Sequence, residues 1–185
     1  MGWVAIGAIH EIRTCMNAAS ILVEAYGRLR RQVHRAVDEL DQAALAYRPD
    51  LGANSIAWLV WHLTRVQDDH IAHIAGCDQI WITSDWAAEL GMDADASRLG
   101  QGDGPAEVGA LRPTDPSPLL GYHNEVADRS VDYLAGVDVH ELGRIIDHNY
   151  TPPVSVGVRL VSVLNDNLQH AGQARYLRGI IERMS

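Results

Sequence analysis

Asp166 and His170 lie four residues apart near the C-terminus, in a stretch whose apolar residues, among them Val163 and Leu177, recur at helical spacing. Residues i and i+4 share one face of a helix about one turn apart, so a carboxylate and an imidazole at this spacing can bind one metal ion. A buried carboxylate is costly unless a cation or a hydrogen-bond donor compensates it. The pair therefore predicts either half of a metal site or a simple Asp–His contact.

His62 offers a third ligand because it lies among Leu59, Leu63 and Val66 on the apolar face of an earlier helical segment. His62, Asp166 and His170 together would hold a divalent cation and leave a coordination position for water or substrate. We expect Zn²⁺, although Ni²⁺ and Fe²⁺ suit the same ligands. The alternative is that His62 is a hydrogen-bonded core residue.

A competing pair, Asp69 and His73, has the same spacing on the helix of His62. His73 is eleven residues beyond His62, which is roughly 16 Å along a helix and outside any coordination sphere. We therefore expect His73, together with His70, to face solvent or a loop near the helix end.

Three further residues are candidates for binding substrate: Arg159, Arg65 and Trp58. Arg159 lies two turns before Asp166 on the same face, and a guanidinium there could anchor a substrate carboxylate. Arg65 is one turn from His62, and either arginine could instead pair with an acidic side chain. Trp58 is placed to roof a pocket or to fill the core. No side chain is assigned as the catalytic group, which would be a metal-bound water or thiolate.

Four amphipathic segments must position these residues. Apolar periodicity and end signals predict helices over residues 18–41, 55–76, 118–135 and 155–183, with an extended stretch at 144–153. Five glycines and four prolines between residues 91 and 118 predict a long surface loop. We expect an all-α four-helix bundle, antiparallel or with a crossover, formed by one domain over residues 17–185 that follows an N-terminal extension at 1–16.

Composition narrows the function classes. The chain has 185 residues and a formal net charge of −9, which disfavours nucleic acid and anionic membranes as partners. No apolar run approaches the length of a membrane span, and the N-terminus lacks the basic start of a signal peptide. Two cysteines are no disulfide framework, so we expect a cytoplasmic protein.

Three segments resemble the DinB-like superfamily: NSIAWLVWHLTR at 54–65, PPVSVGVRLVS at 152–162 and DNLQHAGQARYLRG at 166–179. The resemblance implies a four-helix bundle that holds a divalent metal through a histidine of the second helix and a pair on the fourth. The sequence is most similar to the branch that includes mycothiol-dependent maleylpyruvate isomerase and related thiol transferases, in which a glutamate replaces the first histidine of that pair. Asp166 is one methylene shorter than that glutamate.

The resemblance implies a metal-dependent enzyme that transfers a low-molecular-weight thiol, such as mycothiol or bacillithiol, to an electrophile or uses it as cofactor for an isomerisation. It also implies a homodimer. Two alternatives stay open at this point. One is a metal-binding or stress-related bundle without turnover, and the other is a bare helical scaffold in which Asp166 and His170 bond only to each other.

Overall fold

The computed structural model describes residues 16–184, so residues 1–15 of the expected N-terminal extension lie outside the described residues. The long helices are α1 (Ala18–Val37), α3 (Ile56–Ala75), α7 (Ser117–Ala135) and α9 (Val156–Met184). The short ones are α2 (Gln42–Leu45), α4 (Ile80–Thr83), α5 (Trp86–Glu89), α6 (Pro105–Ala110) and α8 (Val139–Gly143). Strands β1 (Ile145–Asp147) and β2 (Val154–Ser155) form a small antiparallel sheet in which Ile145 faces Ser155 and Asp147 faces Val154. The expected all-α bundle is confirmed.

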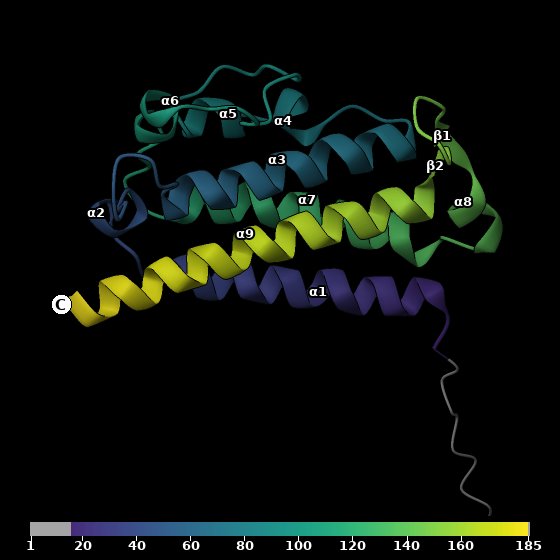
Figure 1. The fold of residues 1–185 in the computed structure, drawn as a ribbon, viewed down its shortest axis with the longest axis horizontal. Helices are drawn as coiled ribbons and strands as arrows, with labels where there is room; N and C mark the ends of the chain where they lie inside the picture. Colours follow the sequence, from purple (N-terminus) through teal and green to yellow (C-terminus); the bar gives the residue numbers. More distant parts are fainter. Residues whose placement is uncertain (1–15, 185) are drawn as a thin grey trace, which may run out of the picture.

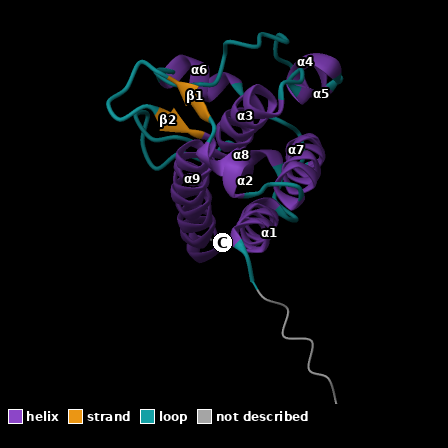
Figure 2. Cartoon of the chain, turned by 90° about the vertical axis from the view of Figure 1, so that its right-hand side faces the viewer, coloured by secondary structure: helices purple, strands orange, loops and turns teal. Residues whose placement is uncertain are grey.

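The four long helices form a ring in which α3 and α1 each pack against both α7 and α9 (Figures 1 and 2). Contacts between His62 and His170 and between His70 and Arg159 show that α3 and α9 run antiparallel. By contrast, α3 and α7 run parallel, so the chain crosses back over the length of the bundle between them (Figure 1). The residues of this crossover, 76–116, lie along α3.

Capping explains where the long helices start and end. Ser55 accepts a hydrogen bond from the Trp58 N–H at the start of α3, and Gly76 ends that helix with a positive φ of 68°, as the sequence predicts. The first helix is shorter than predicted. It stops at Val37, Glu39 follows with a positive φ of 64°, and the side chain of Asp41 then caps a separate short helix, α2.

Among the polar side chains buried in the bundle, one chain of three links α3, α7 and α9. Asn167 on α9 donates to Gln67 on α3 at 2.9 Å, and Gln67 donates to Ser130 on α7 at 2.7 Å. All three residues are buried. Because an unpaired buried amide is costly, these bonds favour one register of α9 against α3.

The crossover contains more structure than the loop predicted over residues 91–118. It includes the six-residue helix α6, and Val108 and Leu111 are buried in the core. A helix this short shows no full apolar period, so its sequence did not reveal it. Within residues 16–184, no helix combines the length and apolar character that crossing a membrane requires.

Candidate metal centre

His62 projects from α3 toward α9 and is 8% exposed. Its Nδ1 lies 2.5 Å from the carbonyl oxygen of Leu99, in the crossover. Because a carbonyl only accepts hydrogen bonds, Nδ1 carries the proton and Nε2 keeps its lone pair. Burial lowers the pKa of His62, which favours the neutral imidazole that a metal requires.

His170 is oriented in the same way from α9. Its Nδ1 lies 2.8 Å from Oε1 of Gln173, so the amide oxygen accepts the proton of Nδ1 and Nε2 is again the free nitrogen. The rings of His62 and His170 meet edge to face with centroids 4.8 Å apart. Nε2 of His170 is 3.6 Å from Oδ1 of Asp166, one turn earlier.

Asp166 completes a group whose ligand atoms all lie within 4.8 Å of one another. Over residues 16–184, this is the one group of three or more histidine, cysteine or acidic side chains close enough to hold an ion. Its second carboxylate oxygen, Oδ2, is buried and has no hydrogen-bond partner. An unpartnered carboxylate oxygen beside two imidazoles with free Nε2 atoms fits a divalent cation, after small adjustments toward bond lengths of about 2.1 Å.

The surroundings of Asp166 differ from the aliphatic core that its spacing suggests. Its side chain is 41% exposed, because the buried face of α9 runs instead through Leu160, Val163, Asn167 and Ala171. Asp166 and His170 lie at the edge of that face, where α9 meets α3. The burial argument therefore applies to one oxygen of the carboxylate and not to the whole group.

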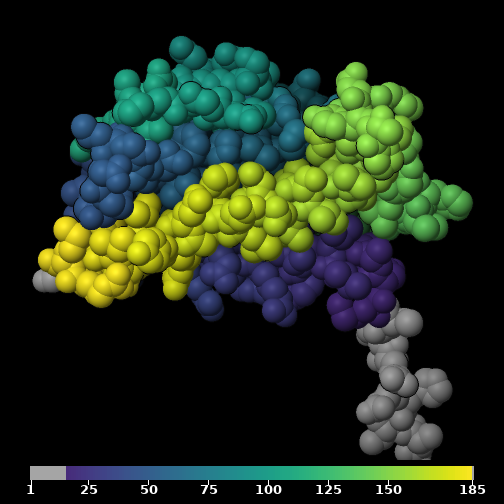
Figure 3. Space-filling view, in the orientation of Figure 1, coloured from purple at the N-terminus to yellow at the C-terminus, as the bar shows by residue number. Residues whose placement is uncertain are grey.

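The three side chains open into a cleft of about 840 Å³ between α3 and α9. The crossover borders one side of the cleft, and the β1–β2 segment lies at one end of it. Figure 3 shows both segments from the side of α9. Trp58 lines the cleft at 6% exposure and stacks on His62 with centroids 4.7 Å apart. Its indole N–H donates to Asp103, which ties the crossover to α3.

Gly100 allows the crossover to approach the site. Its φ is +90°, a conformation that favours glycine. A Cβ at this position would lie 2.7 Å from the Trp61 ring and 3.0 Å from the Trp58 ring. Only glycine therefore lets the preceding carbonyl, that of Leu99, reach His62 without displacing an indole.

Comparison with known proteins identifies the family of the chain. A family model for mycothiol-S-transferase matches residues 21–183. The chain belongs to the mycothiol-S-transferase family. A solved structure titled as the conserved protein of locus from Enterococcus faecalis is similar, with a TM-score of 0.81 and 26% identity over 88% of this chain and 96% of that one. No curated protein matches. The resemblance to the DinB-like superfamily and its thiol-transferase branch is thus confirmed.

In this member of the mycothiol-S-transferase family, Arg159 lies in the same cleft as the candidate metal-binding group, which consists of His62, Asp166 and His170. Its Nη1 donates to Nδ1 of His70 at 2.9 Å, and its Nη2 lies 3.7 Å from Asp147 of β1. Arg159 therefore pairs with Asp147 and not with Asp166. Burial and, to a smaller extent, Arg159 lower the pKa of His70, so its imidazole is neutral and accepts the bond. His70, expected at the surface, is instead part of the cleft wall.

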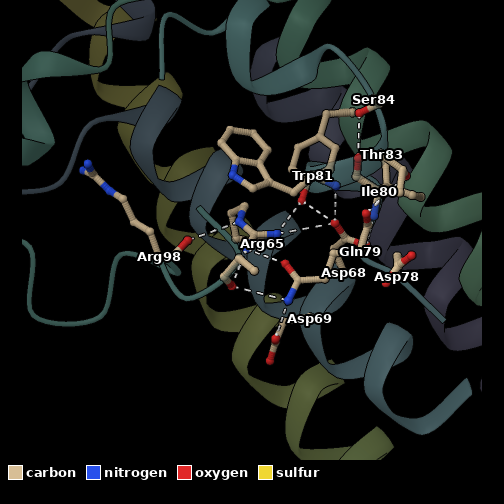
Figure 4. A network of polar contacts seen from close by, with 12 residues as sticks. Arg65, Asp68, Asp69, Asp78, Gln79, Ile80, Trp81, Thr83, Ser84 and Arg98 are labelled. Carbon is tan, nitrogen blue, oxygen red and sulfur yellow. Dashed lines mark hydrogen bonds and ion pairs between the residues drawn. The ribbon is translucent and has the colours of Figure 1, made fainter. Parts of the chain in front are cut away.

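Arg65, the other predicted substrate-binding arginine, does not reach the cleft. It is 0% exposed, and Figure 4 shows its guanidinium enclosed by Asp68, Gln79 and the backbone of Arg98. The competing pair is also excluded from the site. His73 is exposed, and Asp69 accepts a hydrogen bond from Gln79.

Sequence reasoning missed the groups that orient the two imidazoles. Asn167 and Gln169 flank the ligands in sequence, but Asn167 bonds to Gln67 and Gln169 to the backbone of its own helix. Gln173 fills this role for His170, and its i+3 spacing was a usable signal. The Leu99 carbonyl had no such signal, because a backbone acceptor leaves no trace in residue types.

Proposed function

We propose that this chain is a divalent-metal-dependent S-transferase that joins a low-molecular-weight thiol, of the mycothiol type, to an electrophile. One observation carries the proposal: two imidazoles with free Nε2 atoms and a carboxylate with an unpartnered oxygen converge on an open cleft. A closed structural site would surround its ion with protein ligands. The cleft therefore favours the enzyme over a metal-binding bundle without turnover.

His62, Asp166 and His170 would hold the cation, with Zn²⁺ as the first choice and Ni²⁺ or Fe²⁺ as alternatives. When bound, the cation supplies Lewis acidity that lowers the pKa of a coordinated thiol toward neutrality. The hydrogen bonds from His62 to Leu99 and from His170 to Gln173 keep each ring in one tautomer. These bonds fix the direction of both lone pairs before any ligand arrives.

The nucleophile is a cosubstrate and not a side chain. Of the cysteines, Cys77 is exposed and lies in a different depression, beside His73 and Ala96, and Cys15 lies outside the described residues. In the proposed reaction the thiolate sulfur forms a bond to an electrophilic carbon, the leaving group departs with its electron pair, and the thiol proton passes to solvent. An exposed free thiol such as Cys77 suits the reducing cytoplasm, where we place the enzyme.

Arg159 would anchor an anionic or strongly polar end of one substrate. It lies seven residues before Asp166 on α9, which corresponds to about 10 Å along the helix. The Arg159 side chain lines the cleft and is 17% exposed. A carboxylate at this end would place the reacting end of the same molecule beside the metal-binding group.

The proposed partners are therefore a small thiol and an electrophile, and the homodimer implied by the resemblance stays a prediction. Four exposed apolar side chains on α9 could serve such an interface: Val158, Val161, Leu168 and Tyr176. Light scattering at several concentrations measures the oligomeric state.

The test combines metal content with turnover. Protein purified without a metal-chelating tag should contain close to one divalent ion per chain and should conjugate mycothiol to a fluorogenic alkyl halide. His170→Ala should lose the ion and at least about 100-fold of the rate. Gln169→Ala is the matched control because Gln169 is exposed and bonds only to the backbone of α9. Full turnover in His170→Ala, or wild-type protein that neither contains nor rebinds metal, would contradict the proposal.

A further inference from the structure

The guanidinium of Arg65 is fully buried and makes contacts in two directions (Figure 4). On one side Nη1 donates to the Tyr122 hydroxyl at 3.0 Å and lies 3.4 Å from Oδ2 of Asp68. On the other side Nη2 donates to the carbonyl of Ala96 at 3.1 Å, and Nε donates to the carbonyl of Arg98 at 3.2 Å. Arg65 therefore links the interior of the bundle to the backbone of the crossover.

Asp68 lies beside the Arg65 guanidinium and balances its positive charge. Asp68 is 1% exposed and accepts hydrogen bonds from the N–H groups of Ile80 and Trp81 and from Tyr122. These donors and the neighbouring guanidinium offset the cost of burying the carboxylate. This half of the network attaches α4 and α7 to α3, and it does not touch the cleft.

One of the two carbonyls that Arg65 contacts belongs to the residue directly before Leu99, which contacts His62 of the metal-binding group. Arg98 is followed by Leu99, whose carbonyl accepts the Nδ1 proton of His62. His62 and Arg65 are three residues apart on α3, so both side chains meet the same stretch of the crossover. Beyond Leu99, the bond from the Trp58 indole to Asp103 holds the next turn of the chain.

We propose that Arg65 is a positioning residue for the metal centre, holding the Ala96 and Arg98 carbonyls so that the Leu99 carbonyl stays against His62. This inference rests on the proposed function, because the fixed tautomer matters for a cation that binds the free Nε2 of His62. Lysine cannot replace the guanidinium in this role. A single ammonium group cannot reach two carbonyls while it also contacts Asp68 and Tyr122.

The test compares Arg65→Lys with Tyr122→Phe in the full-length protein. Tyr122→Phe removes the hydroxyl from the Asp68 side and leaves both carbonyl contacts in place. Gln79→Ala is a milder third variant, because Gln79 is only partly buried and supports the Ala96 carbonyl from outside. Zn²⁺ affinity is measured by competition with a chromophoric chelator, and the tautomer of His62 is read from its ¹⁵N shifts in metal-free protein.

We expect Arg65→Lys to weaken Zn²⁺ binding by about 10-fold or more and to mix the His62 tautomers. Gln79→Ala should weaken binding a few-fold, and Tyr122→Phe should leave affinity and tautomer unchanged although it lowers the melting temperature. Wild-type affinity and a single tautomer in Arg65→Lys would overturn the inference, as would equal losses in Tyr122→Phe. If Arg65→Lys does not fold, Arg65→Gln takes its place, because its amide cannot donate to both carbonyls at once, and wild-type affinity with a single tautomer there overturns the inference. If the wild type binds no Zn²⁺, the proposed function fails, and the ¹⁵N measurement still decides the role of Arg65.

Discussion

Gly100 and Gly102 offer a matched pair of substitutions that separates backbone strain from crowding at the metal centre. Both glycines have positive φ angles, +90° and +86°. A Cβ at Gly100 would meet Trp61 at 2.7 Å, Trp58 at 3.0 Å and Nδ1 of His62 at 3.2 Å, whereas a Cβ at Gly102 would meet nothing within 4 Å. The two alanine variants therefore share the strain and differ in the collision.

The expected cost follows from these two terms. An alanine forced to positive φ loses about 1–2 kcal/mol, which is the whole expected effect of Gly102→Ala on the free energy of unfolding. Gly100→Ala adds crowding against two indoles that are themselves tightly packed, worth about 1–3 kcal/mol more. Relief of the crowding moves the Leu99 carbonyl away from His62, so only this variant should lose about 10-fold or more in metal affinity.

Urea denaturation of chelator-treated protein measures the free energy of unfolding, and a Zn²⁺ competition titration measures the metal affinity. The wild type and both alanine variants are compared under the same buffer and salt. Equal losses of stability in the two variants would show that the indoles of Trp58 and Trp61 move aside at little cost in free energy. Wild-type metal affinity in Gly100→Ala would refute the claim that the crossover backbone shapes the site.

Two other predictions follow. Arg159→Gln should raise the KM for a carboxylate-bearing substrate by about 10-fold or more with a smaller change in kcat, because it removes an anchor remote from the reacting atoms. Steady-state kinetics with the acid and the methyl ester of one electrophile test this prediction. Stability should fall as the pH drops below about 6.5, since burial lowers the pKa of His123 to about 3 and the unfolded state therefore binds a proton that the folded state refuses. The loss starts near pH 6.5, is complete near pH 3 and reaches about 2 kcal/mol at pH 5; denaturation curves at pH 7 and pH 5 test it, and His123→Gln should show a shallower decline.

The sequence allowed a good prediction of the long helices and of the residues that meet at the site. Apolar periodicity over 19 to 29 residues defines α1, α3, α7 and α9, because each must bury a face against the others. The i, i+4 spacing on α9 and one histidine on the apolar face of α3 suggested the grouping of His62, Asp166 and His170, and the family resemblance favoured it over a simple Asp–His contact. The structure brings these three together, as it does Arg159 with the cleft.

Features that depend on the register between distant segments were beyond sequence reasoning. His70 pairs with Arg159 only because α3 and α9 run antiparallel with one particular offset, which Gln67 and Asn167 help to set. Arg65 has one partner at local spacing, Asp68, but its other contacts come from α7 and the crossover, and no local pattern connects them. Short helices such as α6 are too brief to show a period.

The crossover contributes to the centre through its main chain, and none of its own side chains belongs to the metal-binding group. We expect the chain shape around Leu99 and Gly100 to persist in any relative that binds a metal ion at this site, whereas the exposed side chain of Gln101 borders the cleft and is free of that demand. Exchange of Gln101 would alter which electrophile fits while both imidazoles keep their orientation. Divergence of substrate preference among such bundles is therefore expected to concentrate in this segment and to spare the four long helices.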